Sequence, residues 1–161
     1  MPRTLRCTIL LLVLVLVPAL GQAATAVSYQ PTTEQQVLQL LNQIRRQYGL
    51  GLLVVSPQLR TAARAHSVDM LQRSYFDHSS PGQSFNSRLA RYVKSSLIGE
   101  TVAWGEGSAG TPAGIVGQWM QSAAHRRTIL APDLRRVGIG FAKGTFEGVP
   151  SAVVATADFA A

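Results

Sequence analysis

The single cysteine of this sequence, Cys7, lies near the start of its 161 residues. One cysteine cannot form an intramolecular disulfide, and it cannot supply the paired thiolates of a zinc finger. A domain built from the rest of the chain must therefore be held together by an apolar core. Apolar residues make up 47% of the chain and charged residues 14%. This balance excludes a disordered protein, and the length suits one domain.

The first 26 residues have the pattern of a secretory signal peptide. They begin with two basic residues, Arg3 and Arg6, and continue with an unbroken apolar run from Ile9 to Val17. Two sites with small residues, at Ala23 and Ala26, then offer places for cleavage. These are the three regions of a cleaved leader. The alternative is a membrane anchor, but a spanning helix needs about 20 apolar residues. The run from Cys7 to Leu20 has 14 residues and contains Pro18. We expect cleavage after Ala23 or Ala26 and a secreted protein, periplasmic or extracellular.

Cleavage at either position leaves a basic domain. Loss of Arg3 and Arg6 leaves 13 basic and 8 acidic residues, a net charge of +5. Outside the cytoplasm we expect no nucleic-acid partner. Anionic envelope material such as teichoic acid, lipopolysaccharide or phospholipid headgroups is the natural partner of such a charge. The alternative is a moderate charge that only keeps the domain soluble. We expect a monomer with no transmembrane span after cleavage.

Hydrophobic periodicity predicts helices first and then strands mixed with helices. Residues 27–33 are expected to be a linker, followed by one domain over 34–161. Within it we expect helices over 33–48, 57–74, 84–92 and 124–130, another opening at 111–112, and extended segments at 52–55, 97–104, 137–142 and 152–159. The last two strands, joined by a turn over 144–150, are close enough to form a hairpin. This order favours an α+β domain with an antiparallel sheet and helices on its faces.

A glycine motif in the middle of the chain suggests a nucleotide site. Residues Gly105 to Gly110 match G-x-G-x-x-G between a predicted strand and a predicted helix, the context of a dinucleotide fingerprint. That fold also needs a second parallel strand whose end carries an acid about 20 residues later. Asp133 is 23 residues after Gly110, but it lies in a Pro-Asp turn. We interpret the glycines as a flexible turn and expect no nucleotide cofactor.

Three histidines and one glutamate are the candidates for chemistry. His66 lies on the apolar face of a predicted helix, where a core histidine with one hydrogen bond is the common case. His78 lies in a loop, where function and simple solvation are equally good explanations. Glu100 lies inside an apolar strand and must face solvent, a cleft or a partner, because an unpaired buried charge is too costly. His125 lies between two predicted helical segments.

From Val37 to Phe159 the chain resembles the CAP superfamily (cysteine-rich secretory, antigen 5 and pathogenesis-related 1 proteins). It is most similar to the bacterial, cysteine-free, YkwD-type branch. The segments that carry the resemblance follow one another in the family order: Leu41-Asn42-x-x-Arg45, Leu59-x-x-Ala62-Ala63-x-x-His66-Ser67-x-Asp69-Met70, Tyr75 to Gly82, Arg88-Leu89, Gly99-Glu100-Thr101, Trp119-Met120-x-Ser122-x-x-His125-Arg126, and Val137 to Gly140.

The resemblance implies an α-β-α sandwich with a central antiparallel sheet and a large cleft. In many members two histidines and two acids line the cleft, and some bind a divalent metal, usually zinc. His78, Glu100 and His125 match three of these positions and are the expected metal ligands and cleft residues. The second acid has no counterpart, since Gln121 or Ser122 fills its place. Two further departures are Thr101 for the usual Asn, and Ala123-Ala124 for the usual Pro-Gly before the second histidine.

Three function classes follow from the resemblance. The first is a secreted binding module whose cleft takes a lipid, a peptide or an envelope fragment, with zinc or another divalent cation as an optional cofactor. The second is a metal-assisted hydrolase acting on peptide or cell-wall material, because two imidazoles and a carboxylate are acceptable zinc ligands. The third is a structural or regulatory protein that binds an envelope protein. The missing acid favours binding over catalysis, and the chain has no G-x-S-x-G nucleophile elbow.

Overall fold

The computed structural model describes residues 31–161, with side chains from residue 33 onward. The predicted signal peptide lies outside the described residues. The elements follow one another as α1 (Pro31–Gln47), β1 (Val54–Val55), α2 (Pro57–Arg73), α3 (Phe85–Leu89), β2 (Ile98–Gly105), α4 (Pro112–Gln121), α5 (Ala123–Ile129), β3 (Arg136–Phe146) and β4 (Val149–Ala160). Because α1 begins at Pro31, residues 31–33 of the predicted linker belong to this helix.

The strands form one mixed sheet in the order β1-β3-β4-β2. β3 and β4 form the predicted hairpin, and β4 also pairs antiparallel with β2. The sheet is not wholly antiparallel, because β1 runs parallel to β3, with Val54 opposite Arg136. A parallel pair needs a long connection, which here runs through α2, β2 and three further helices, and no local sequence pattern records this pairing.

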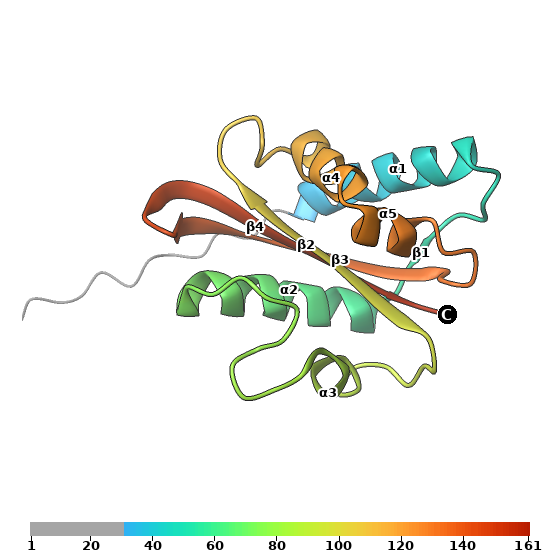
Figure 1. Ribbon diagram of the computed structural model, residues 1–161, viewed down its shortest axis with the longest axis horizontal. Helices are drawn as coiled ribbons and strands as arrows, with labels where there is room; N and C mark the ends of the chain where they lie inside the picture. Colours follow the sequence, from blue (N-terminus) through green and yellow to red (C-terminus); the bar gives the residue numbers. More distant parts are fainter. Residues whose placement is uncertain (1–30) are drawn as a thin grey trace, which may run out of the picture.

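Helices cover both faces of this sheet, which makes the domain an α-β-α sandwich. Figure 1 shows α2 and α3 below the sheet and α1, α4 and α5 above it. The core above the sheet includes Trp119, Phe141 and Phe159, whereas Met70 and Phe146 belong to the core beneath it. The predicted α+β sandwich is therefore confirmed.

Two glycines of β3 allow α2 to lie directly on the sheet. A Cβ atom at Gly138 would lie 1.9 Å from the backbone carbon of Leu59, and one at Gly140 would lie 2.3 Å from the backbone nitrogen of Arg64. Real side chains never approach backbone so closely. Ser67 of α2 then donates a hydrogen bond to the Gly140 carbonyl at 3.1 Å. This close contact fixes α2, and with it the loop that carries His78.

Two polar residues of α1 form hydrogen bonds that connect this helix to neighbouring segments. Asn42 Nδ2 donates to the Leu53 carbonyl at 3.1 Å, and its Oδ1 accepts from the Leu53 N–H at 2.8 Å. The buried Arg45 guanidinium donates to the carbonyls of Gly51, Ile129 and Ala131. These bonds tie α1 to the segment before β1 and to the end of α5.

Candidate functional site

The candidate residues converge on β2, which lies at the edge of the sheet. Glu100 is part of this strand, and His78 comes from the loop after α2. His125 lies in the first turn of α5, whose N-cap is Ser122. Asp77 shapes the loop, because its Oδ1 accepts a hydrogen bond from the Ser79 N–H at 2.7 Å. The fold therefore brings together three residues that are 22 and 25 positions apart in the sequence.

His78 contacts both of the other candidates. Its Nδ1 lies 2.7 Å from Glu100 Oε1. Its ring centroid lies 5.8 Å from that of His125, with the two rings nearly perpendicular at 75°. His78 keeps 48% of its side chain exposed, whereas Glu100 keeps 1%. The two imidazoles thus lie at the surface above a buried carboxylate.

Glu100 belongs to a buried network of charges that lies beneath the histidines. Arg88 of α3 donates from NH2 to Glu100 Oε2 and lies 3.4 Å from both carboxylate oxygens of Asp158. Asp158 is opposite Glu100 in the β2–β4 register. Burial, together with the neighbouring Glu100, raises the pKa of Asp158 well above its usual range. One guanidinium therefore serves two buried carboxyl groups.

His66 lies against the same network and is a core histidine, as predicted. Only 1% of this residue is exposed. Its Nε2 lies 2.9 Å from the Asp77 carbonyl and 3.8 Å from Glu100 Oε2. Burial lowers the pKa of His66, which favours the neutral ring.

The two surface histidines have opposite pKa shifts. The hydrogen bond that His78 donates to the Glu100 carboxylate raises the pKa of His78. Burial lowers the pKa of His125, and the nearby His78 lowers it further. As the pH falls, His78 therefore takes up a proton before His125 does. The pair combines one cationic ring with one neutral ring over the pH range between the two values.

A pocket of about 250 Å³ opens beside His125. We call it the β2 pocket. Its apolar lining consists of Phe76, Val102, Ala103, Trp104 and Trp119, and its polar lining consists of Gln118, Ser122 and His125. Because consecutive residues of a strand point to opposite faces, a pocket that touches Val102, Ala103 and Trp104 extends over the edge of β2. The indole Nε1 of Trp119 is buried with no hydrogen-bond partner among the described residues.

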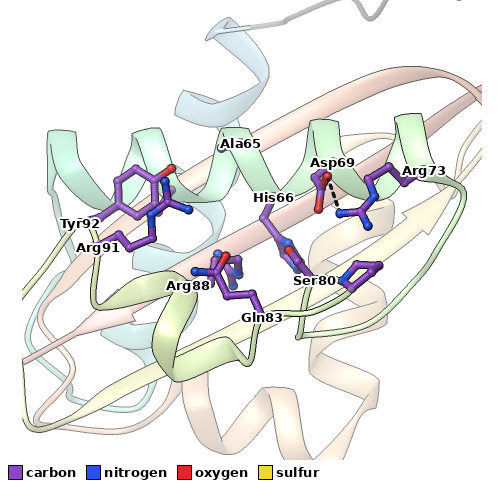
Figure 2. Close-up of a pocket in the computed structure, with 11 residues that line it drawn as sticks. Ala65, His66, Asp69, Arg73, Ser80, Gln83, Arg88, Arg91 and Tyr92 are labelled. Atoms are coloured by element: carbon purple, nitrogen blue, oxygen red, sulfur yellow. Dashed lines mark hydrogen bonds and ion pairs between the residues drawn. The ribbon is translucent and has the colours of Figure 1, made fainter.

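A separate pocket of about 290 Å³ lies on the other side of the network. We call it the α2 pocket. Its wall includes α2, the loop over residues 80–83, and Arg88 of α3. Figure 2 shows these side chains, with His66 and Arg88 beneath the helix. Arg88 thus connects the buried carboxylates with this second cavity.

The three residues that the resemblance implies as metal ligands lie together, but they do not form a set that is placed to hold an ion. In the described part of the chain, no group of three or more His, Cys, Asp or Glu side chains is placed to hold a metal ion. Both Glu100 oxygens already accept hydrogen bonds, from His78 and from Arg88. Zinc binding by His78, Glu100 and His125 stays a prediction.

Sequence reasoning missed Arg88 and Asp158 as members of the site. Asp158 is a carboxylate inside an apolar strand, which is the same signal that singled out Glu100. Arg88 lies on the inner side of a short helix, and only the fold shows that it reaches both acids. The glycine turn is as predicted, because residues 106–110 form turns between β2 and α4.

Comparisons with known proteins decide the family. Residues 38–159 match the model of the CAP family, the cysteine-rich secretory protein family. The chain belongs to this family. The CAP domain is 33% identical over 130 residues to the uncharacterized protein YkwD of Bacillus subtilis, covering 77% of this chain and 49% of that protein. It is also 34% identical to the uncharacterized membrane protein YlbC of the same organism, over 69% of this chain and 32% of that protein.

Solved structures support the same fold for the CAP domain. An extracellular SCP-domain protein from Bacillus anthracis is 28% identical with a TM-score of 0.68, over 80% of this chain and 40% of that one. An outer surface protein from Borrelia burgdorferi has a TM-score of 0.69 over 82% of this chain and 96% of that one. At 17% identity, the second likeness shows the fold alone. The chain spans less than half the length of the two Bacillus subtilis relatives that it matches.

Proposed function

We propose that this CAP domain is exported and binds an acyl chain of a cell-envelope lipid in the β2 pocket, without catalysing a reaction. The observation that carries the proposal is the pocket itself, in which aromatic and aliphatic side chains are bordered by His125 and lie next to His78. Burial of apolar ligand surface contributes about 25 cal/mol per Å². Within residues 31–161, no helix is long and apolar enough to cross a membrane.

The charges around the pocket suit an anionic headgroup. The raised pKa of His78 favours its cationic form at the mouth of the site. Arg126 and Arg127 follow His125 in α5, and both are exposed. After loss of the leader the chain has a net charge of +5. Such a field raises the local concentration of anionic ligands and weakens as salt is added.

The commitment of Glu100 argues for binding over catalysis. A general base needs a free acceptor within hydrogen-bonding reach of the proton that it removes. Both oxygens of Glu100 are occupied, and Asp158 lies behind Arg88 with none of its side chain exposed. No serine of the described chain is hydrogen-bonded to a histidine side chain in a way that would activate it as a nucleophile.

Intrinsic fluorescence provides a direct test. The sequence has two tryptophans, Trp104 and Trp119, and both line the β2 pocket. Titration with lauric acid is expected to change their emission saturably, and a Phe76→Ala variant is expected to bind several-fold more weakly. A Tyr48→Ala variant is the matched control, since Tyr48 is an exposed aromatic residue directly after α1.

Two results would contradict acyl-chain binding, and a third would contradict the absence of catalysis. One is a fluorescence response that is equal in wild type and Phe76→Ala. The other is saturable binding of an apolar peptide with no response to lauric acid or to phospholipid vesicles, which would identify a peptide as the occupant. Turnover of phospholipid or cell-wall fragments that disappears in a folded His78→Ala variant would make the protein an enzyme.

A further inference from the structure

The α2 pocket contains a buried hydrogen-bond donor with no acceptor. Arg88 uses NH1 and NH2 for Asp158 and Glu100. Its Nε has no hydrogen-bond partner in the described structure, although only 6% of the side chain is exposed. A buried donor left unpaired costs about 1–3 kcal/mol. Arg88 also lines the α2 pocket, so a ligand oxygen that reaches this nitrogen would supply the missing acceptor.

The charged side chains around the pocket favour an anion. Arg73, Arg88 and Arg91 line it together with one acid, Asp69. That acid is already engaged, because Asp69 Oδ2 accepts from the Tyr75 hydroxyl at 2.5 Å and Oδ1 lies 3.4 Å from Arg73 NH1 (Figure 2). Arg91 is exposed, and no ion pair of its side chain is found within residues 31–161.

Two buried carboxyl groups lie behind Arg88. Glu100 and Asp158 bind the terminal nitrogens of Arg88 and offset its charge. The excess positive charge at the pocket therefore comes from Arg91, and Arg88 contributes a directed N–H donor. Guanidinium groups bind carboxylates and phosphates with short, charge-assisted hydrogen bonds. The combination suits one oxyanion placed between Arg88 and Arg91.

The other side chains that line the pocket suit a small polar group attached to that anion. Gln83 and Ser80 supply an amide and a hydroxyl group, and Tyr92 and Pro81 supply flat or apolar surface. Figure 2 shows Gln83 beside Arg88, and Arg91 and Tyr92 together at one end of the pocket. The volume of about 290 Å³ is near the lower limit of pockets that hold small molecules.

We propose that the α2 pocket is a second binding site, which takes a ligand about the size of one sugar ring that bears a carboxylate or a phosphate. Arg88 Nε and the Arg91 guanidinium hold the oxyanion, and Gln83 binds the attached polar groups. The site is distinct from the β2 pocket and does not depend on acyl-chain binding there.

Three probes that share one sugar test the site and distinguish the two anions. They are N-acetylglucosamine, its 6-phosphate, and N-acetylmuramic acid, which adds a carboxylate. Binding to the full chain is followed by backbone amide NMR shifts at low and at high salt. The expected result is that at least one anionic probe binds about tenfold more tightly than the neutral sugar, with shifts at Gln83, Arg91 and Tyr92 that weaken as salt is added.

Variants separate a directed site from general charge attraction. Arg91→Ala is expected to remove most of the preference for the anionic probes. Arg46→Ala, an exposed arginine of α1 that lies outside the pocket, is the matched control and is expected to leave the preference unchanged. Gln83→Ala tests the neutral contacts without changing charge, and is expected to weaken all bound probes.

Several outcomes would overturn the proposal. Equal binding of the neutral and anionic sugars would remove the role of the oxyanion. If Arg91→Ala and Arg46→Ala lost the preference for anionic probes equally, that preference would be an effect of net charge and not of a directed site. No binding by any probe, or shifts confined to the β2 pocket, would show that the α2 pocket is not a binding site for this class of ligand.

Discussion

Replacement of Arg88 by methionine tests the buried charge network most sharply. Arg88 is 5% exposed and binds Glu100 and Asp158, which are 6% and 0% exposed. Methionine keeps much of the side-chain volume and removes the charge, so that both carboxyl groups lose their only arginine contact in the described structure. Loss of one partner from a buried ion pair typically costs about 3–5 kcal/mol. We expect Arg88→Met to lower the free energy of unfolding by that amount at pH 7.

The loss is expected to depend on pH. Arg88 holds down the raised pKa of Asp158, so without the guanidinium this pKa rises further and the folded protein binds a proton that the unfolded chain releases near neutrality. Lowering the pH therefore stabilises the folded variant relative to its unfolded state. The deficit between Arg88→Met and wild type should shrink from pH 7 to about pH 5. Adding Glu100→Gln and Asp158→Asn should recover about half of the loss at pH 7.

Urea unfolding followed by circular dichroism measures these differences. The matched control is Arg91→Met, which removes an exposed arginine three residues later and should cost less than about 0.5 kcal/mol. A deficit for Arg88→Met below about 1 kcal/mol that is also independent of pH would refute the reasoning. If Arg88→Met does not fold at all, the triple variant still tests it, because removal of both acids should restore folding.

Three further predictions concern the histidines and the packing. Histidine NMR titration should place the pKa of His78 above 6.5 and that of His125 below it, and Glu100→Gln should move the pKa of His78 back toward 6.5. A pKa of His125 above that of His78 would contradict the assigned contacts. Gly140→Ala should cost more than about 2 kcal/mol in urea unfolding, since its Cβ would overlap α2 backbone, whereas Gly117→Ala, with open space at Cβ, should not. Asn42→Ala should cost about 1–3 kcal/mol, because the Leu53 N–H loses its acceptor; a cost equal to that of the exposed Asn86→Ala would argue against it.

Much of the fold could be predicted from local signals in the sequence. Ser56-Pro57 and Thr111-Pro112 mark the starts of α2 and α4, where the serine and threonine hydroxyls cap the helices. The C-terminal hairpin was also predictable, but its strands are longer than the pattern indicated. β3 continues through an irregularity between Gly144 and Phe146, and the turn narrows to Glu147 and Gly148, both with positive φ.

The site was only partly predictable, because its parts meet through tertiary structure. His78, Glu100 and His125 could be singled out one by one, and the family resemblance grouped them. Nothing local indicated that Glu100 would be held between His78 and Arg88. That arrangement depends on α3 docking beneath the sheet and on β4 placing Asp158 opposite Glu100. Whether an acid in a strand pairs with an arginine in a helix depends on how the two elements pack, which only the fold shows.

The most direct measurement of the central claim is to locate a bound acyl ligand on the protein. Amide and tryptophan side-chain NMR spectra recorded with lauric acid should shift saturably at Phe76, Trp104, Trp119 and His125, the residues around the β2 pocket. The Trp119 indole N–H, which has no partner in the described structure, is expected to be among the largest shifts. Saturable shifts centred elsewhere, such as the exposed apolar residues Tyr48, Leu52 and Val54, would contradict the account.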